Sequence, residues 1–143
     1  MSKRFKGWSG KSIVNYQLLM VKEAAPATKD GKSKTDYSEL IAGVLRGAGL
    51  ECVTEYRFLK DRRFKFDVAL PGHLIAIEYE GGIYSQGRHT RGKGYANDCK
   101  KYNLATMHGW KLLRLTCVDL REQGWEHELT SNVLRLCESG RVL

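Results

Sequence analysis

Three acidic residues near the middle of the chain have the types and spacing that could hold a divalent cation. Asp67 is followed after ten residues by Glu78, and Glu80 comes two residues later. Side chains two apart on a strand share a face, so an extended segment presents Glu78 and Glu80 together. Crowded carboxylates repel one another unless a cation or protons neutralise them, and Mg²⁺ is a hard cation that also supports phosphodiester cleavage. The alternative interpretation is an ordinary solvated sheet face with scattered charges.

The segments that must position these acids alternate between apolar and polar residues, as β-strands do. The pattern predicts three consecutive antiparallel strands at residues 52–59, 64–70 and 74–80, with a turn at Pro71 and Gly72. On the second strand, one face is expected to carry Phe64, Phe66, Val68 and Leu70, and the other Arg63, Lys65, Asp67 and Ala69. On the third strand, one face should carry Ile75, Ile77 and Tyr79, and the other Ala76, Glu78 and Glu80. A hairpin that pairs the apolar faces therefore also brings the acids together.

Apolar residues at helical spacing predict helices before and after these strands. The first helix is marked by Leu40, Ile41, Val44 and Leu45, and Gly47 and Gly49 end it. After a loop rich in Gly and Arg at 81–94, the pattern predicts a helix at 95–108, a strand at 110–116 and a helix near 126–138. The predicted order is αβββαβα, within one α/β domain at residues 35–143.

Charge and composition point to a polyanionic partner. The chain of 143 residues has a formal net charge of +8, which suits nucleic acid. Residues 1–34 contain eight basic and two acidic residues, so we interpret them as a basic N-terminal arm, with a solvated tail as the alternative. No apolar run is long enough to span a bilayer and no secretory signal is evident, so we expect a cytoplasmic protein. The four cysteines are widely spaced, which favours reduced thiols over a zinc site.

The acidic residues and their neighbours resemble a known nuclease family. Phe66-Asp67, ten residues, and then Glu78-Tyr79-Glu80-Gly81-Gly82 resemble the PD-(D/E)xK motif. The resemblance extends through residues 88–94, 98–103 and 109–116, and is greatest to the small domains related to very-short-patch repair endonucleases that phages and prophages often carry. It implies a restriction-endonuclease-like αβββαβ core, with a mixed central sheet flanked by helices. It also implies a DNA endonuclease that uses Mg²⁺, with Mn²⁺ as a substitute.

The same resemblance assigns roles to individual residues. Asp67 would be the central metal ligand, Glu78 the second, and the backbone carbonyl of Tyr79 a third. The chain departs from the common form at Glu80, where most members have the lysine that orients the attacking water. We expect Glu80 to bind or orient a hydrated metal. The positive group must then come from elsewhere, and we assign it to Lys101, with Lys100 as the other candidate.

Glu39 is a further candidate, because the family often places another carboxylate on the first helix near the metal. Asp36 and Glu39 also have the spacing of a capping box, in which side chains satisfy the backbone N–H groups at the start of a helix. Both interpretations place Glu39 on the first helix.

Several basic residues are candidates for DNA contact. The run Arg88, His89, Arg91 and Lys93 is interspersed with glycines and suits a flexible phosphate clamp, although an exposed charged loop would look the same. His89 is a candidate general acid for the leaving oxygen, because the reference pKa of histidine suits that role. We also assign Lys100, Arg63 and Lys65 to DNA binding.

The leading hypothesis is an endonuclease selective for branched, junction or damaged DNA, because no separate sequence-reading domain is evident. A homodimer is a further expectation by analogy. The alternatives are a non-catalytic nucleic-acid-binding protein on the same fold, and a phage-borne inhibitor or adaptor of a host protein.

Overall fold

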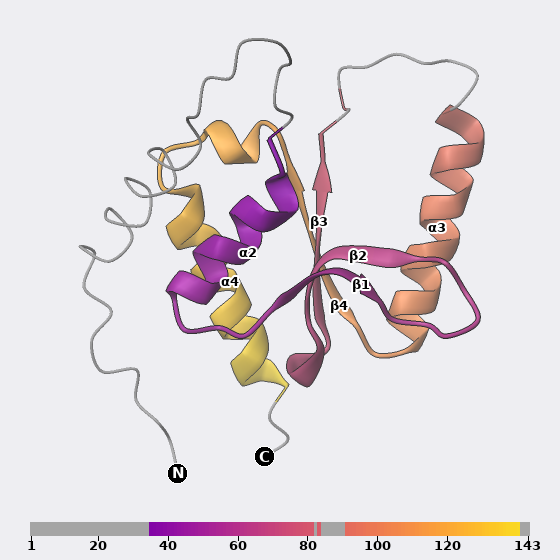
Figure 1. Ribbon diagram of the computed structural model, residues 1–143, viewed down its shortest axis with the longest axis horizontal. Helices are drawn as coiled ribbons and strands as arrows, with labels where there is room; N and C mark the ends of the chain where they lie inside the picture. The colour runs from indigo at the N-terminus through magenta and orange to yellow at the C-terminus, as the bar shows by residue number, and fades with distance from the viewer. Residues whose placement is uncertain (1–34, 82, 84–90, 141–143) are drawn as a thin grey trace.

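The computed structural model describes residues 35–81, 83 and 91–140 (Figure 1). Its helices and strands are α2 (Tyr37–Gly47), β1 (Val53–Arg57), β2 (Lys65–Leu70), β3 (Ile75–Glu80), α3 (Arg91–Met107), β4 (Lys111–Thr116) and α4 (Trp125–Ser139), with short 3-10 turns η1 (Pro71–His73) and η2 (Asp119–Arg121). The predicted αβββαβα order is confirmed. The predicted basic arm, 1–34, lies outside the described residues. None of the helices in the described ranges has the length and apolar character that crossing a bilayer requires.

The four strands form one mixed sheet in the order β1-β2-β3-β4. The pairs β1–β2 and β2–β3 are antiparallel, as predicted, while the pair β3–β4 is parallel. The hairpin between β2 and β3 turns through η1, where Leu74 has φ of 52° and its N–H donates to the carbonyl of Pro71. Val68 lies opposite Ile77 and Leu70 opposite Ile75, which is the register that pairs the apolar sets.

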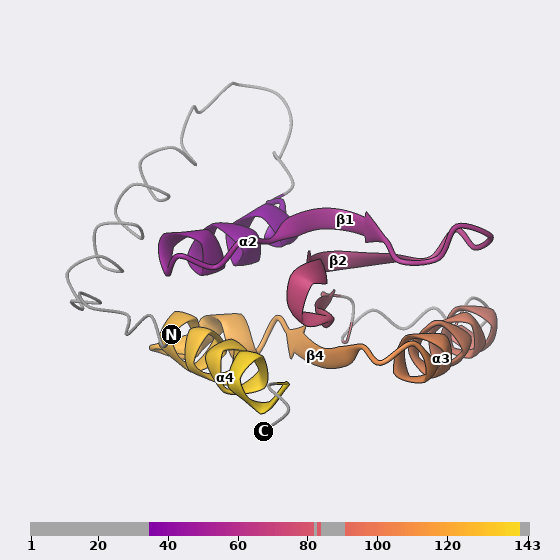
Figure 2. The same cartoon turned by 90° about the horizontal axis from the view of Figure 1, so that it is seen from below.

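Helices cover both faces of this sheet (Figures 1 and 2). The larger core cluster lies on the side of α2 and α4; its fully buried members include Ile41, Leu45, Val68, Ile77 and Val133. The smaller cluster lies on the side of α3 and contains Phe66, Ala69, Ala76, Ala105 and Trp110. The described residues therefore form a three-layer α/β/α arrangement, in which α3 is the one described helix on its face of the sheet.

The alternation predicted for the second strand is wrong at Phe66. This ring belongs to the α3 side, whereas Val68 and Leu70 belong to the side of α2 and α4. On the partner strand β1, Glu55 has the left-handed φ of 51°. Its two neighbours, Thr54 and Tyr56, lie on opposite faces of the sheet. Thr54 donates to Glu39 of α2, while the ring of Tyr56 lies 5.7 Å from that of Trp110 in the α3-side cluster.

Both strands therefore change face at the same rung, at Glu55 on β1 and Asp67 on β2. The register on either side of this rung is constant, with Thr54 opposite Val68 and Tyr56 opposite Phe66, so no residue is inserted. A local reversal of the backbone at Glu55 breaks the simple period of two that the prediction assumed. Asp67 consequently sits where the sheet changes direction.

Helix α3 begins at Arg91, whereas the sequence predicted a loop as far as residue 94. The predicted loop is wrong at residues 91–94, because Gly92 and Gly94 are a loop signal in the sequence but form part of α3. In the structure both glycines belong to the helix, and a Cβ at either position would meet no other atom within 4 Å. Lys93 therefore lies in the first turn of a helix and not in a flexible loop.

Candidate functional site

Asp67 and Glu78 lie where the backbone ladder between β2 and β3 ends. Regular pairing runs from Leu70 opposite Ile75 to Val68 opposite Ile77. At the next rung, the Asp67 N–H donates to Oε1 of Glu78 at 3.3 Å, and the Tyr79 N–H donates to Oδ2 of Asp67 at 2.8 Å. Each carboxylate thus accepts a backbone N–H from the opposite strand. The predicted approach of Asp67 and Glu78 is confirmed.

Lys101 of α3 completes a group of three ionisable side chains. Its Nζ lies 2.7 Å from Oε1 of Glu78, and the side chains of Lys101 and Glu78 are only 10% and 9% exposed. The same Nζ lies 5.5 Å from the centre of the Phe66 ring. Lys101 and Ala105 are the two buried residues of α3 among those whose side chains are described, and they are one helical turn apart. A lysine therefore occupies a position on the buried face of α3 where an apolar residue is expected.

Burial dominates the electrostatics of the acidic pair. It raises the pKa of Asp67 more than the hydrogen bond from the Tyr79 N–H and the charge of Lys101 lower it. Burial likewise raises the pKa of Glu78, against the hydrogen bond and charge of Lys101. Asp67 further raises the pKa of Glu78 by repulsion. The two carboxylates therefore hold their negative charges at a cost that a cation would relieve.

Glu80 makes different contacts. Its Oε1 accepts hydrogen bonds from the hydroxyl of Tyr102 at 3.0 Å and from Nε and Nη2 of Arg114 at 3.1 and 2.9 Å. The Arg114 guanidinium also lies 4.8 Å from the centre of the Tyr102 ring. Glu80 raises the pKa of Asp67 by its charge, so it is near the pair, but its Oε1 is bonded to α3 and β4. Its assignment as a metal ligand stays a prediction.

The backbone and side chain of Tyr79 face different parts of the molecule. The ring stacks on Tyr37 of α2, with centres 4.3 Å apart, while Glu78 and Glu80 on either side of it contact α3. The alternation predicted for the third strand is therefore confirmed. The role of the Tyr79 carbonyl as a ligand stays a prediction.

Glu39 is held by groups outside the acidic pair. Its Oε2 accepts from Arg46 at 3.1 Å and its Oε1 from the Thr54 hydroxyl at 2.8 Å. The Glu39 N–H donates to Oδ1 of Asp36 at 3.2 Å, so the N-cap half of the predicted capping box is confirmed. Within the part of the chain that the structure describes, no contact joins Glu39 to Asp67 or Glu78, and a role near the metal stays a prediction.

The predicted DNA-binding residues that the structure describes lie on α3, on β2 and in the β1–β2 connection. Lys93 and Lys100 are exposed on α3, Arg63 is exposed in the β1–β2 connection, and Lys65 is exposed on β2 with Glu55 at 3.5 Å. Arg91 starts α3, and Arg88 and His89 lie outside the described residues. Lys100 does not reach the acidic pair, so of the two candidate lysines the structure brings only Lys101 to it.

Tyr102 and Arg114 were not predicted. Arg114 is the partner of Glu78 in the parallel register of β3 and β4, and Tyr102 follows Lys101 on α3. One signal for Arg114 was present, since it is the only charged residue in the otherwise apolar run 112–115. Its partner Glu80 depends on the register of two strands that are far apart in the sequence, which no local pattern fixes.

The pair of Asp67 and Glu78 suits a magnesium ion. Among residues 35–81, 83 and 91–140, no group of three or more His, Cys, Asp and Glu side chains is arranged to hold a metal ion. Mg²⁺, however, is commonly bound through one or two carboxylates, with water and substrate phosphate supplying the remaining oxygens. Two adjacent carboxylates with raised pKa values, Glu78 buried and Asp67 half-buried, therefore fit this ion.

No protein-family model, curated protein or solved structure matches the chain.

Proposed function

We propose that the chain is a Mg²⁺-dependent DNA endonuclease with a restriction-endonuclease-like core of the PD-(D/E)xK type. The observation that carries this proposal is the chain of contacts from Asp67 to Glu78 to Lys101, with Lys101 2.7 Å from Glu78. A solvated sheet face would leave such groups exposed and independent. Burying two acids and a lysine together has a desolvation cost in stability. Clusters of this kind are enriched at functional sites, where the chemistry needs them despite that cost.

The three side chains have separate roles in this proposal. Asp67 and Glu78 would hold the metal, together with the backbone carbonyl of Tyr79. When bound, Mg²⁺ supplies positive charge beside the phosphodiester and makes water more acidic, and Mn²⁺ would substitute for it. Lys101 has three N–H donors, of which one serves Glu78. The other two can orient the attacking water and a phosphate oxygen, which is the role that lysine has in the common motif.

DNA is the substrate that best fits the charge of the chain. The net charge is +8, and Lys93, Lys100 and Arg63 are exposed on α3 and the β1–β2 connection, the elements that flank the site. No second domain is present among the described residues to read a base sequence. Recognition of DNA by its shape, such as a branch, a junction or a damaged position, is therefore the proposed basis of selectivity.

Cleavage assays with different DNA forms test this proposal. Purified protein is incubated with plasmid, single-stranded and four-way-junction DNA in Mg²⁺, in Mn²⁺ and in EDTA. We expect cutting with either metal and none in EDTA, with the junction cut faster than intact duplex. Equal cutting in EDTA would contradict metal dependence. Binding without cleavage of any substrate would instead support a non-catalytic DNA-binding protein.

A further inference from the structure

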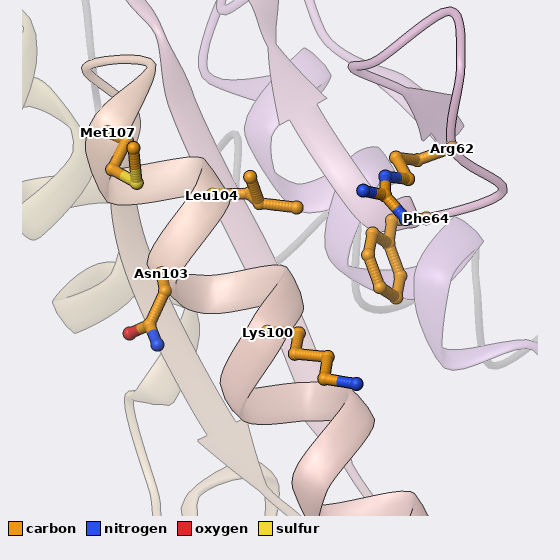
Figure 3. Close-up of a pocket in the computed structure, with 6 residues that line it drawn as sticks. All are labelled: Arg62, Phe64, Lys100, Asn103, Leu104 and Met107. Carbon is orange, nitrogen blue, oxygen red and sulfur yellow. The ribbon is translucent and has the colours of Figure 1, made fainter.

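A pocket of about 280 Å³ opens between α3 and the connection from β1 to β2 (Figure 3). It is lined by Arg62, Phe64, Lys100, Asn103, Leu104 and Met107. Figure 3 shows Arg62 and Phe64 on one wall, with Lys100 and Leu104 extending toward them from the helix. This volume is just below the usual range for small-molecule sites, about 300–1,000 Å³, which suits a single planar ring system.

Phe64 gives this pocket an aromatic surface. The neighbouring rings of Phe58 and Phe66 stack on each other with centres 4.2 Å apart. In the described part of the chain, the half-buried ring of Phe64 stacks on no other ring. Leu104 and Met107 add apolar surface from α3. The interior can therefore accept a flat, apolar face.

The rim of the pocket is cationic. Lys100 is exposed and has no hydrogen-bond or ion-pair partner among residues 35–81, 83 and 91–140. Among the described residues, the side chain of Arg62 has one ion pair, with the adjacent Asp61 at 4.0 Å. These side chains are 61% and 81% exposed, so the pair holds the Arg62 guanidinium weakly. An aromatic surface between two available cations matches a nucleobase and the phosphates beside it. An apolar peptide side chain would use the interior but leave both cations without a role.

The pocket adjoins the proposed catalytic groups along the chain. Phe64 precedes Asp67 by three residues, and Lys100 directly precedes Lys101. Three residues of extended chain span about 10 Å, which is about three base steps of a DNA strand. A base in the pocket would therefore belong to a nucleotide close to the bond that is cut.

We propose that this pocket binds one unpaired nucleobase of the DNA, stacked on Phe64, while Arg62 and Lys100 contact the flanking phosphates. The inference rests on the proposed function for its ligand, and it narrows the substrate to DNA with an unpaired base. Bases inside an intact duplex are covered by their neighbours, whereas a bulged, mismatched or single-stranded base costs least to bring out.

Binding measurements in EDTA test the pocket separately from catalysis. The probes are a duplex with one bulged base and the same duplex with an abasic residue at the bulge. Loss of one stacked base costs about tenfold or more in affinity, so the unmodified protein should prefer the first duplex by about that factor. Phe64→Leu should abolish the preference, and Phe64→Tyr, which keeps a ring, should retain it. Tyr95→Leu, at an aromatic residue that is 71% exposed on α3 outside the pocket, should leave it unchanged.

A second comparison tests the cationic rim. Lys100→Gln should weaken binding of both duplexes more than Lys60→Gln does, because Lys60 is an exposed lysine of the same charge outside the pocket. Equal effects of the two changes would contradict phosphate contact by Lys100.

The proposal would be overturned by equal affinity of the unmodified protein for the two duplexes. It would also be overturned if Phe64→Leu, shown to be folded by its thermal melt, kept the preference. Because no metal is present, failure to cut DNA would count against the proposed nuclease and leave the pocket standing. A missing preference would in turn leave the nuclease standing.

Discussion

At the scale of single residues, Asp67 is subject to two opposing effects. Its Oδ2 accepts the Tyr79 N–H, which favours the ionised form, yet burial has the larger effect and raises its pKa. The native state therefore holds this proton more tightly than the unfolded chain does. It follows that the contribution of Asp67 to the free energy of unfolding falls as pH rises from the ordinary value of 3.8 through the raised native pKa.

Asp67→Asn should remove this pH-dependent loss of stability, because asparagine does not ionise. The variant keeps an oxygen that accepts the Tyr79 N–H. In EDTA, the melting temperature of the variant minus that of the unmodified protein should become more positive as pH rises from 4 to 7, the interval above the ordinary value of 3.8. Thermal melts across that range measure it. A difference that is constant, or that becomes more negative with rising pH, would show that the native state does not raise the pKa of Asp67.

Lys101→Met leaves Glu78 buried without its partner. Breaking a buried ion pair on one side costs about 3–5 kcal/mol, so urea unfolding should show a loss of this order. The double variant Lys101→Met, Glu78→Gln should recover much of the loss, since neither group is then charged, but should remain inactive. If the single variant is as stable as the unmodified protein, the 2.7 Å contact does not hold in solution.

At the scale of the elements, consecutive residues of α3 contact alternate residues of β3. Lys101 binds Glu78, and Tyr102 binds Glu80, which Arg114 of β4 also holds. The second set of contacts fixes the height and rotation of α3 on the sheet. In the described part of the chain, α3 is the one helix on its face and has few buried residues, so these polar contacts position Lys101 at the acidic pair.

Tyr102→Phe should therefore lower the maximal cleavage rate without changing the Mg²⁺ concentration for half-maximal activity. Tyr95→Phe, an exposed tyrosine on the same helix, is the matched control and should change neither. Metal titrations of the cleavage rate measure both quantities.

Glu80→Gln belongs in the same series, because altering a metal ligand would raise the Mg²⁺ concentration for half-maximal activity and altering a positioning residue would not. The contacts of Glu80 favour the second result.

The elements also show which features a sequence can predict. The hairpin of β2 and β3 was predictable because its alternation and its Pro71-Gly72 turn are local signals, and it brought Asp67 and Glu78 together. The face of Phe66 was not predictable, since it depends on the left-handed backbone of Glu55 on another strand. Nor was the bond from Arg114 to Glu80, which requires the parallel register of β3 and β4.

At the scale of the whole molecule, charge governs the encounter with DNA. Residues 1–34 contain eight basic residues, so their removal should weaken binding and flatten its salt dependence. If all eight contact phosphates, the slope of log affinity against log salt should decrease in magnitude by up to about 7. Fluorescence titrations at several salt concentrations measure the slope. An unchanged slope would show that this segment does not contact DNA.

The most direct test of the acidic pair is single-turnover cleavage by matched aspartate variants. A four-way junction is incubated at saturating Mg²⁺ with the unmodified protein, with Asp67→Asn and with Asp61→Asn. The side chain of Asp61 is 81% exposed and, among the described residues, is paired with Arg62. Loss of a metal ligand should slow Asp67→Asn by at least about 100-fold, while Asp61→Asn cuts at the unmodified rate. If Asp67→Asn cuts the junction as fast as the unmodified protein, the proposed nuclease centre is wrong.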